Sequence, residues 1–228
     1  MVSELKKYKV INIVCAHPDD EIIFFGPFLN SSLFNNSRKC LVNVYCLTCK
    51  DHAVRSKEFA LFMDSLSVNY KIYDYKIVRG MNFFNIYRYY RWIKSNVNTL
   101  SNQTLFVTHS IYGDDHFHPQ HIFLSIATLL YVRIYRYDVL FSNNLLFANT
   151  FYKSSFYSSN QNLIFKYLKL FLMLLSRIIY KKSFFMSCRK STIKKSISCY
   201  KSQNLSYNTL IENKFHFSEF RLWLLLRT

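Results

Sequence analysis

The sequence is poor in glycine, proline and acidic residues, and each shortage narrows what the chain can be. Only 3 Gly and 3 Pro occur among 228 residues while 50% are hydrophobic, which argues against disorder. Asp and Glu number 13 against 30 Lys and Arg, for a formal net charge of +17. Since this length suits one domain with a sizeable core, we expect a single folded and strongly basic α/β domain.

Long uncharged hydrophobic runs and a secretory leader are also missing. The first ten residues carry three lysines and lead directly into the first expected strand. In the apolar segment 163–180 the longest uncharged stretch is Leu170 to Ser176, which is too short to span a bilayer. We therefore expect a cytoplasmic chain with reduced cysteines. The pair Cys46 and Cys49 lacks a second C-x-x-C, so we expect core and strand-end cysteines rather than a zinc ribbon.

Alternating apolar runs predict alternating strands and helices. We expect strands at 10–15, 41–48, 70–75, 104–108 and 138–142, and helices at 20–33, 53–65, 84–97 and 119–135. This alternation implies right-handed βαβ crossovers and a Rossmann-like, mostly parallel sheet in the order 3-2-1-4-5, flanked by helices. In that order the first and fourth strands are neighbours, so the residues that follow them should meet in one cleft.

Two polar clusters follow those two strands. The first reads Ala16-His-Pro-Asp-Asp-Glu21, and the second runs from Thr108 to His121 as T-H-S-I-Y-G-D-D-H-F-H-P-Q-H. Alone, the acidic run of the first cluster favours a capped helix start, in which an aspartate accepts backbone N–H bonds. Together they hold five of the seven histidines: His17, His109, His116, His118 and His121. Imidazole and carboxylate are the usual ligands of zinc or iron, so the two clusters favour a metal site.

These clusters resemble the signatures of the PIG-L family of zinc-dependent sugar de-N-acetylases, also called the LmbE-like family. The signatures are A-H-P-D-D-E after the first strand and a later H-P-x-H-like segment, which stand here as Ala16 to Glu21 and His118 to His121. The resemblance covers residues 8 to 135. It implies hydrolysis of the acetamide of an N-acetylglucosamine-type sugar on a glycolipid or glycan precursor, with release of acetate.

The resemblance also implies a role for each matched residue. His17, Asp20 and His121 would bind the metal, Zn²⁺ in the family, with another divalent transition metal such as Fe²⁺ as the alternative. Asp19 would be the general base. His118, when protonated, would stabilise the oxyanion. The spacing is compatible with these roles, because one of two adjacent carboxylates can face the metal while the other reaches the attacking water.

Other positions carry alternatives that the sequence leaves open. Arg55 resembles the arginine of the family's R-x-x-E segment and would contact substrate, with an ordinary surface arginine as the alternative; Glu58 would then be a structural partner. The chain departs from the family at Gln120, where an acidic residue is usual, and at 48–52, where a glycine-rich loop is common. Four loop residues either orient the ligands or are plain polar residues: His109, Asp114, Asp115 and His116.

The last third of the chain is markedly basic. From Lys153 onward, 14 Lys and Arg face two acids, so this part supplies about +12 of the net charge. No nucleic-acid-binding signature accompanies the charge, so we expect no nucleic acid partner. A solvated basic face and attraction to anionic lipid or a phosphate-bearing substrate remain alternatives. Likewise 163–180 is a core helix, a membrane-surface helix or an anchor.

The sequence therefore predicts an α/β deacetylase core with a metal site at 1–150, and a basic, mainly helical part at 151–228 packed on the same domain. The expected enzyme is a cytoplasmic zinc-dependent de-N-acetylase whose partner is an N-acetylated sugar conjugate, with peripheral membrane association as an open question. The alternative is a non-catalytic basic scaffold that binds a membrane surface or nucleic acid. Metal content separates the two, since only the enzyme should hold about one ion per chain.

Overall fold

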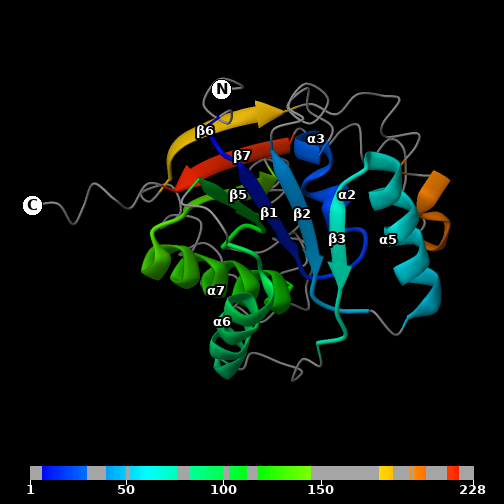
Figure 1. Cartoon of the computed structure of the whole chain (residues 1–228), viewed down its shortest axis with the longest axis horizontal. Helices are drawn as coiled ribbons and strands as arrows, with labels where there is room; N and C mark the ends of the chain where they lie inside the picture. The colour runs from blue at the N-terminus through cyan, green and yellow to red at the C-terminus, as the bar shows by residue number, and fades with distance from the viewer. Residues whose placement is uncertain are drawn as a thin grey trace, which may run out of the picture.

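A single seven-stranded sheet organises the chain in the computed structural model (Figure 1). The structure describes residues 7–29, 40–49, 52–75, 83–99, 103–111, 118–144, 180–186, 196, 198–203 and 215–220. The strand order is β3-β2-β1-β4-β5-β7-β6. Its first five strands are β1 Val10–Cys15, β2 Leu41–Cys46, β3 Asn69–Ile72, β4 Thr104–Thr108 and β5 Asp138–Asn144. They pair in parallel, which confirms the predicted order 3-2-1-4-5.

Helices cover both faces of the parallel sheet. They are α2 Asp20–Ile23, α3 Gly26–Leu29, α5 Ala53–Leu66, α6 Phe84–Asn96 and α7 Pro119–Tyr135. One hydrophobic core packs α2, α3 and α5 against one face, and a second packs α6 and α7 against the other (Figure 1). Along β1, Ile13 and Cys15 enter the first core while Val14 enters the second, as alternation in a doubly covered strand requires. All six β1 residues are buried.

The helix expected at 20–33 is interrupted in the described residues. Two short helices, α2 and α3, stand at its start. Pro27 has no backbone N–H, so it cannot continue the hydrogen-bond pattern of α2. Gly26 allows a close approach at the junction, because a Cβ there would lie 2.9 Å from Ile22 Cδ1. This break lets α2 be a single turn that carries the acidic motif.

Buried amides cross the sheet in a ladder. Asn43 on β2 donates to Asn12 Oδ1 on β1 at 2.9 Å and accepts from Asn69 on β3 at 3.3 Å. Asn12 in turn donates to the backbone oxygen of Asn98 at 2.6 Å. Because Asn12 is fully buried and Asn43 nearly so, these bonds provide the partners that a buried amide needs. The ladder also fixes the mutual register of the three strands.

Two strands extend the sheet beyond β5. β7 (Phe215–Phe220) pairs antiparallel with β5, and β6 (Tyr180–Met186) pairs antiparallel with β7. We predicted a mainly helical part at 151–228. Most of it, including 163–179, lies outside the described residues, and its two longest described elements are strands. Both are short and rich in aromatic residues, a composition typical of strands. No helix in the described part is long and apolar enough to cross a membrane.

Candidate metal and active site

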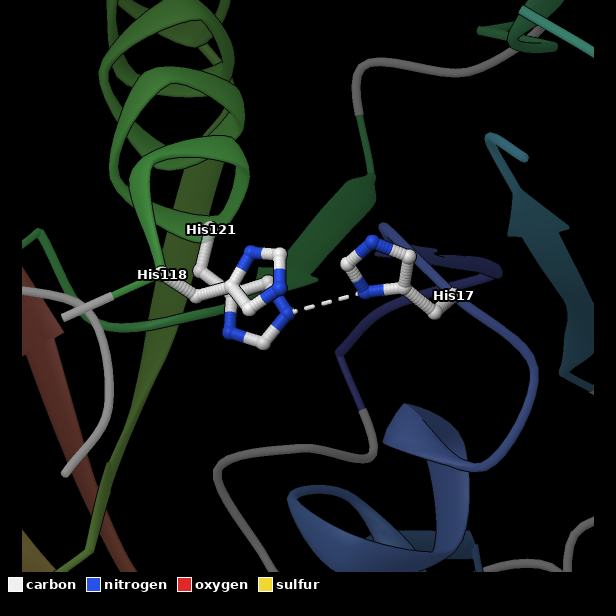
Figure 2. Close-up of side chains that lie close together, drawn as sticks. All are labelled: His17, His118 and His121. Atoms are coloured by element: carbon white, nitrogen blue, oxygen red, sulfur yellow. Dashed lines mark hydrogen bonds between the residues drawn. The ribbon is translucent and has the colours of Figure 1, made fainter. Parts of the chain in front are cut away.

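The two polar clusters meet at the carboxyl ends of β1 and β4, as neighbouring parallel strands require. His17 follows β1, His109 follows β4, and His118 and His121 lie at the start of α7. Figure 2 shows the His17 ring facing the rings of His118 and His121. The His118 ring centroid lies 4.7 Å from those of both His17 and His121. One site therefore contains residues more than 100 positions apart in the chain.

Three side-chain atoms of this site form a nearly equilateral triangle. His17 Nδ1 lies 3.2 Å from His121 Nε2, and both face Asp20 Oδ2, at 3.4 Å and 3.3 Å. A tetrahedral zinc ion with bonds of about 2.0–2.1 Å requires its ligands to stand about 3.3–3.4 Å apart. Two imidazole nitrogens and one carboxylate oxygen are also a donor set that such ions accept. The residues present therefore fit a divalent transition metal.

His109 belongs to the same cluster. Its side chain is 1% exposed, its ring stacks on His121 at a centroid distance of 4.0 Å, and its Nε2 lies 3.4 Å from Asp20 Oδ2. The backbone N–H of Ala16 donates to this nitrogen at 3.2 Å. Burial and the neighbouring His121 lower the pKa of His109 to about 4, so the ring is neutral at pH 7. With its Nε2 lone pair engaged, His109 is a poorer metal ligand than His17.

Asp20 is a buried carboxylate surrounded by nitrogen. Only 5% of its side chain is exposed, and its Oδ2 accepts the backbone N–H of His17 at 2.7 Å. Burial alone would raise its pKa, but the imidazoles of His121 and His109 outweigh burial and hold the pKa of Asp20 well below its ordinary value. Asp20 is therefore ionised at neutral pH.

Asp19, the next residue, has the opposite character. Burial and the adjacent Asp20 charge raise the pKa of Asp19 to about 7, against the opposing effect of Arg55. Its backbone is left-handed, with φ of 97°, which costs a non-glycine residue about 1–3 kcal/mol. Its N–H donates to Glu21 Oε2 at 3.0 Å. A bound cation would favour the ionised form of Asp19, which is the form that a general base needs.

Arg55 is anchored against this strained turn. Its Nη2 lies 3.2 Å from Asp19 Oδ1 and donates to the backbone oxygen of Pro18 at 2.6 Å. The side chain of Arg55 is 23% exposed. His52, the N-cap residue of α5, accepts the Arg55 N–H and fixes the first turn of that helix. The predicted site arginine therefore reaches Asp19, which lies in the preceding βα loop.

Gln120 and Ser125 form hydrogen bonds that fix the positions of the site histidines, a role that the sequence did not predict for either residue. Gln120 Oε1 is hydrogen-bonded to His17 Nε2, which assigns the proton to Nε2 and leaves the Nδ1 lone pair toward the triangle. Ser125 Oγ, on α7, lies 2.7 Å from the backbone oxygens of both His109 and His121. Ser125 therefore ties the end of β4 to the first turn of α7. Neither contact has a signal in the sequence, because each depends on the tertiary arrangement.

The structure thus brings together all six predicted site residues. His17, Asp20 and His121 form the triangle; His118 and Asp19 lie beside it, and Arg55 contacts Asp19. His109, whose role the sequence left open, lies inside the cluster. Its neighbours Asp114, Asp115 and His116 lie outside the described residues. Two groups in the described part of the chain could hold a metal ion, His17 with His118 and His121, and Asp20 with His109 and His121. The triangle takes its members from both groups.

Sequence comparisons give no relative of this chain. No protein-family model matches it. No curated protein matches it significantly.

Comparison with solved structures does find neighbours. A deacetylase solved in complex with teicoplanin, from the teicoplanin biosynthesis pathway, matches with a TM-score of 0.61 at 14% identity, over 93% of this chain and 98% of that chain. A triple mutant of a deacetylase in the teicoplanin biosynthetic pathway gives 0.62 and 14%, over 92% and 98%. The A40926 pseudoaglycone deacetylase Dbv21 gives 0.58 and 12%, over 93% and 96%. The chain therefore shares the α/β fold of these deacetylases.

Proposed function

We propose that this protein is a zinc-dependent de-N-acetylase that hydrolyses the acetamide of an N-acetylglucosamine-type sugar on a glycolipid or glycan precursor. The observation that carries the proposal is the triangle of His17 Nδ1, Asp20 Oδ2 and His121 Nε2, whose sides match the distances between ligands of a tetrahedral ion. The Asp19 carboxylate and the His118 imidazole lie beside this triangle. The shared fold of deacetylases supports the reaction class. The net charge of +17 suits a phosphate-bearing acceptor.

The reaction needs a nucleophile, a stabilised oxyanion and a proton for the amine. A divalent ion held by the triangle would supply an acidified water and a polarised carbonyl. The oxygen of the attacking water bonds to the acetyl carbon while Asp19 accepts a proton from that water. Protonated His118 donates a hydrogen bond to the oxyanion. The C–N bond then breaks, the amine takes the proton back from Asp19, and acetate leaves.

Arg55 serves both Asp19 and the substrate in this proposal. Its bonds to Asp19 Oδ1 and to the Pro18 oxygen hold the carboxylate at the site. Because 23% of its side chain is exposed, a sugar hydroxyl or phosphate can approach the planar guanidinium group, whose fork geometry suits such ligands. Gln120, with one oxygen on His17, keeps the imidazole in the tautomer that binds metal.

The direct test is acetate release from a panel of N-acetylated sugars and their lipid conjugates, before and after removal of metal by a chelator. We expect acetate from at least one N-acetylglucosamine conjugate, loss of that activity on chelation, and recovery with Zn²⁺. A zinc-loaded protein that releases acetate from none of them would contradict the proposed function. A basic scaffold would show neither activity nor a stoichiometric ion.

His121→Ala should abolish metal binding and activity together, because it removes one corner of the triangle. Zinc content per chain after dialysis measures the first effect, and acetate release the second. His52→Asn is a matched control, since it removes an imidazole outside the site while asparagine still caps α5. Full stoichiometric zinc in His121→Ala would show that the ligand assignment is wrong.

Asp19→Asn should keep zinc but lower kcat by about 10²-fold or more, the scale of a positioned acid or base. The amide preserves the size of the side chain but cannot take the proton. KM should stay within a few fold. Asp64→Asn, at an exposed position of α5, is the control for the same chemical change. Turnover near that of the wild type would remove Asp19 from the role of base.

His118→Ala should lower kcat by roughly 10²- to 10³-fold with zinc saturating, the scale of one lost oxyanion donor. Because the donor acts in its protonated form, the wild-type rate should fall on the alkaline side, and this limb should change in the variant. A kcat–pH profile of both proteins measures the effect. Weaker zinc affinity with an unchanged profile would mean instead that His118 only orients His121 or the start of α7.

A further inference from the structure

Glu21 is the acid of the A-H-P-D-D-E motif that the proposed reaction does not use. Its side chain is 0% exposed, although it lies next to the metal ligand Asp20 in the sequence. A buried carboxyl group needs hydrogen-bond partners to be tolerated. Its two oxygens have different partners, and these connect the acidic turn to a distant part of the chain.

One oxygen binds the turn and the other binds the C-terminal part. Glu21 Oε2 accepts the backbone N–H of Asp19 at 3.0 Å, and Glu21 Oε1 accepts a hydrogen bond from the Tyr200 hydroxyl. Tyr200 is 1% exposed, and its ring packs against Phe62 of α5 with a centroid distance of 5.8 Å. The carboxyl group of Glu21 thus bridges Tyr200 and Asp19.

The segment that carries Tyr200 is held at a second point. Glu58 on α5 accepts hydrogen bonds from the backbone N–H of Ser202 at 2.7 Å and from the Ser202 hydroxyl at 2.5 Å. The short helix η2 (Lys201–Gln203) packs against α5 at this place, as Figure 1 shows. Tyr200 is therefore fixed by its own packing and by the next two residues.

We propose that Tyr200 is a positioning residue for the reaction: its hydroxyl, acting through Glu21, holds the left-handed turn at Asp19 and so aims the Asp19 carboxylate. Glu21 has rotatable bonds, and a hydrogen bond to one oxygen fixes where the other points. The Asp19 N–H needs that second oxygen in place, because φ of 97° is unfavourable for aspartate without support. This inference rests on the proposed function, in which Asp19 is the base.

The test compares Tyr200→Phe with Tyr89→Phe. Both changes remove one hydroxyl and keep the ring; Tyr89, on α6, is 0% exposed and its hydroxyl has no hydrogen-bond partner among the described residues. With zinc saturating, Tyr200→Phe should lower kcat per folded molecule by about 10- to 100-fold, the scale for losing a residue that orients the site, with KM within twofold. Tyr89→Phe should leave both constants unchanged.

A cycle with Glu21→Gln identifies the route. If Tyr200 acts through Glu21, the double variant Glu21→Gln, Tyr200→Phe should lose little more kcat than the stronger single variant. Losses that multiply fully would overturn the proposal, because the two residues would then act independently. A Tyr200→Phe protein that is only less thermostable, with kcat per folded molecule unchanged, would also overturn it and leave a packing role.

A readout that needs neither metal nor substrate separates this inference from the proposed function. Hydrogen exchange of the Asp19 amide, followed by NMR, should be faster in Tyr200→Phe than in the wild type and in Tyr89→Phe. If the wild-type protein released no acetate, the proposed function would fail while faster Asp19 exchange still supported the positioning contact. Unchanged Asp19 exchange would overturn the role of Tyr200 whether or not the enzyme is active.

Discussion

The buried charge of Asp20 is the constraint on which the site depends. Removing a carboxylate from water costs several kcal/mol unless other groups replace the lost hydration. Here the backbone N–H of His17 donates to Oδ2 at 2.7 Å, and ring nitrogens of His17, His109 and His121 lie within 3.4 Å of the same oxygen, where a bound cation would replace the remaining hydration. These residues come from the ends of β1 and β4 and the start of α7. The contacts around the buried Asp20 carboxylate therefore bring together the imidazole nitrogens and the carboxylate oxygen that a cation requires as ligands.

Two adjacent carboxylates acquire opposite properties from this arrangement. The imidazoles outweigh burial and keep the pKa of Asp20 low, whereas burial and the neighbouring charge raise the pKa of Asp19 to about 7. Pairs of groups whose environments separate their pKa values commonly divide acid-base work between them. The left-handed backbone at Asp19 makes the division geometric as well, because it turns one carboxylate toward the imidazoles and the other toward Arg55.

Periodicity and motif position predicted most of this architecture. The β4 and α7 bounds match the expected 104–108 and 119–135, and the adjacency of β1 and β4 follows from the βαβ alternation. Contacts that depend on folding could not be predicted. The left-handed backbone at Asp19 and the stacking of His109 on His121 have no local signal, and Tyr200 lies 179 residues from Glu21. In the C-terminal part, the basic charge indicated a surface-binding segment, whereas in the structure two strands rich in aromatic residues, β6 and β7, extend the sheet.

Both glutamates of the two motif segments, Glu21 and Glu58, accept hydrogen bonds from residues 200–202. The loop after β1 and the start of α5 are thus joined twice, directly by Arg55 with Asp19 and indirectly through this distant segment. The direct ion pair is only partly buried, with 23% of the Arg55 side chain and 17% of the Asp19 side chain exposed, so solvent still competes for both charges. The indirect link is buried at Glu21 and Tyr200, so water cannot replace either of these residues as a hydrogen-bond partner if the other is removed. The precision of a site at a loop edge therefore depends on a segment whose own sequence carries no motif.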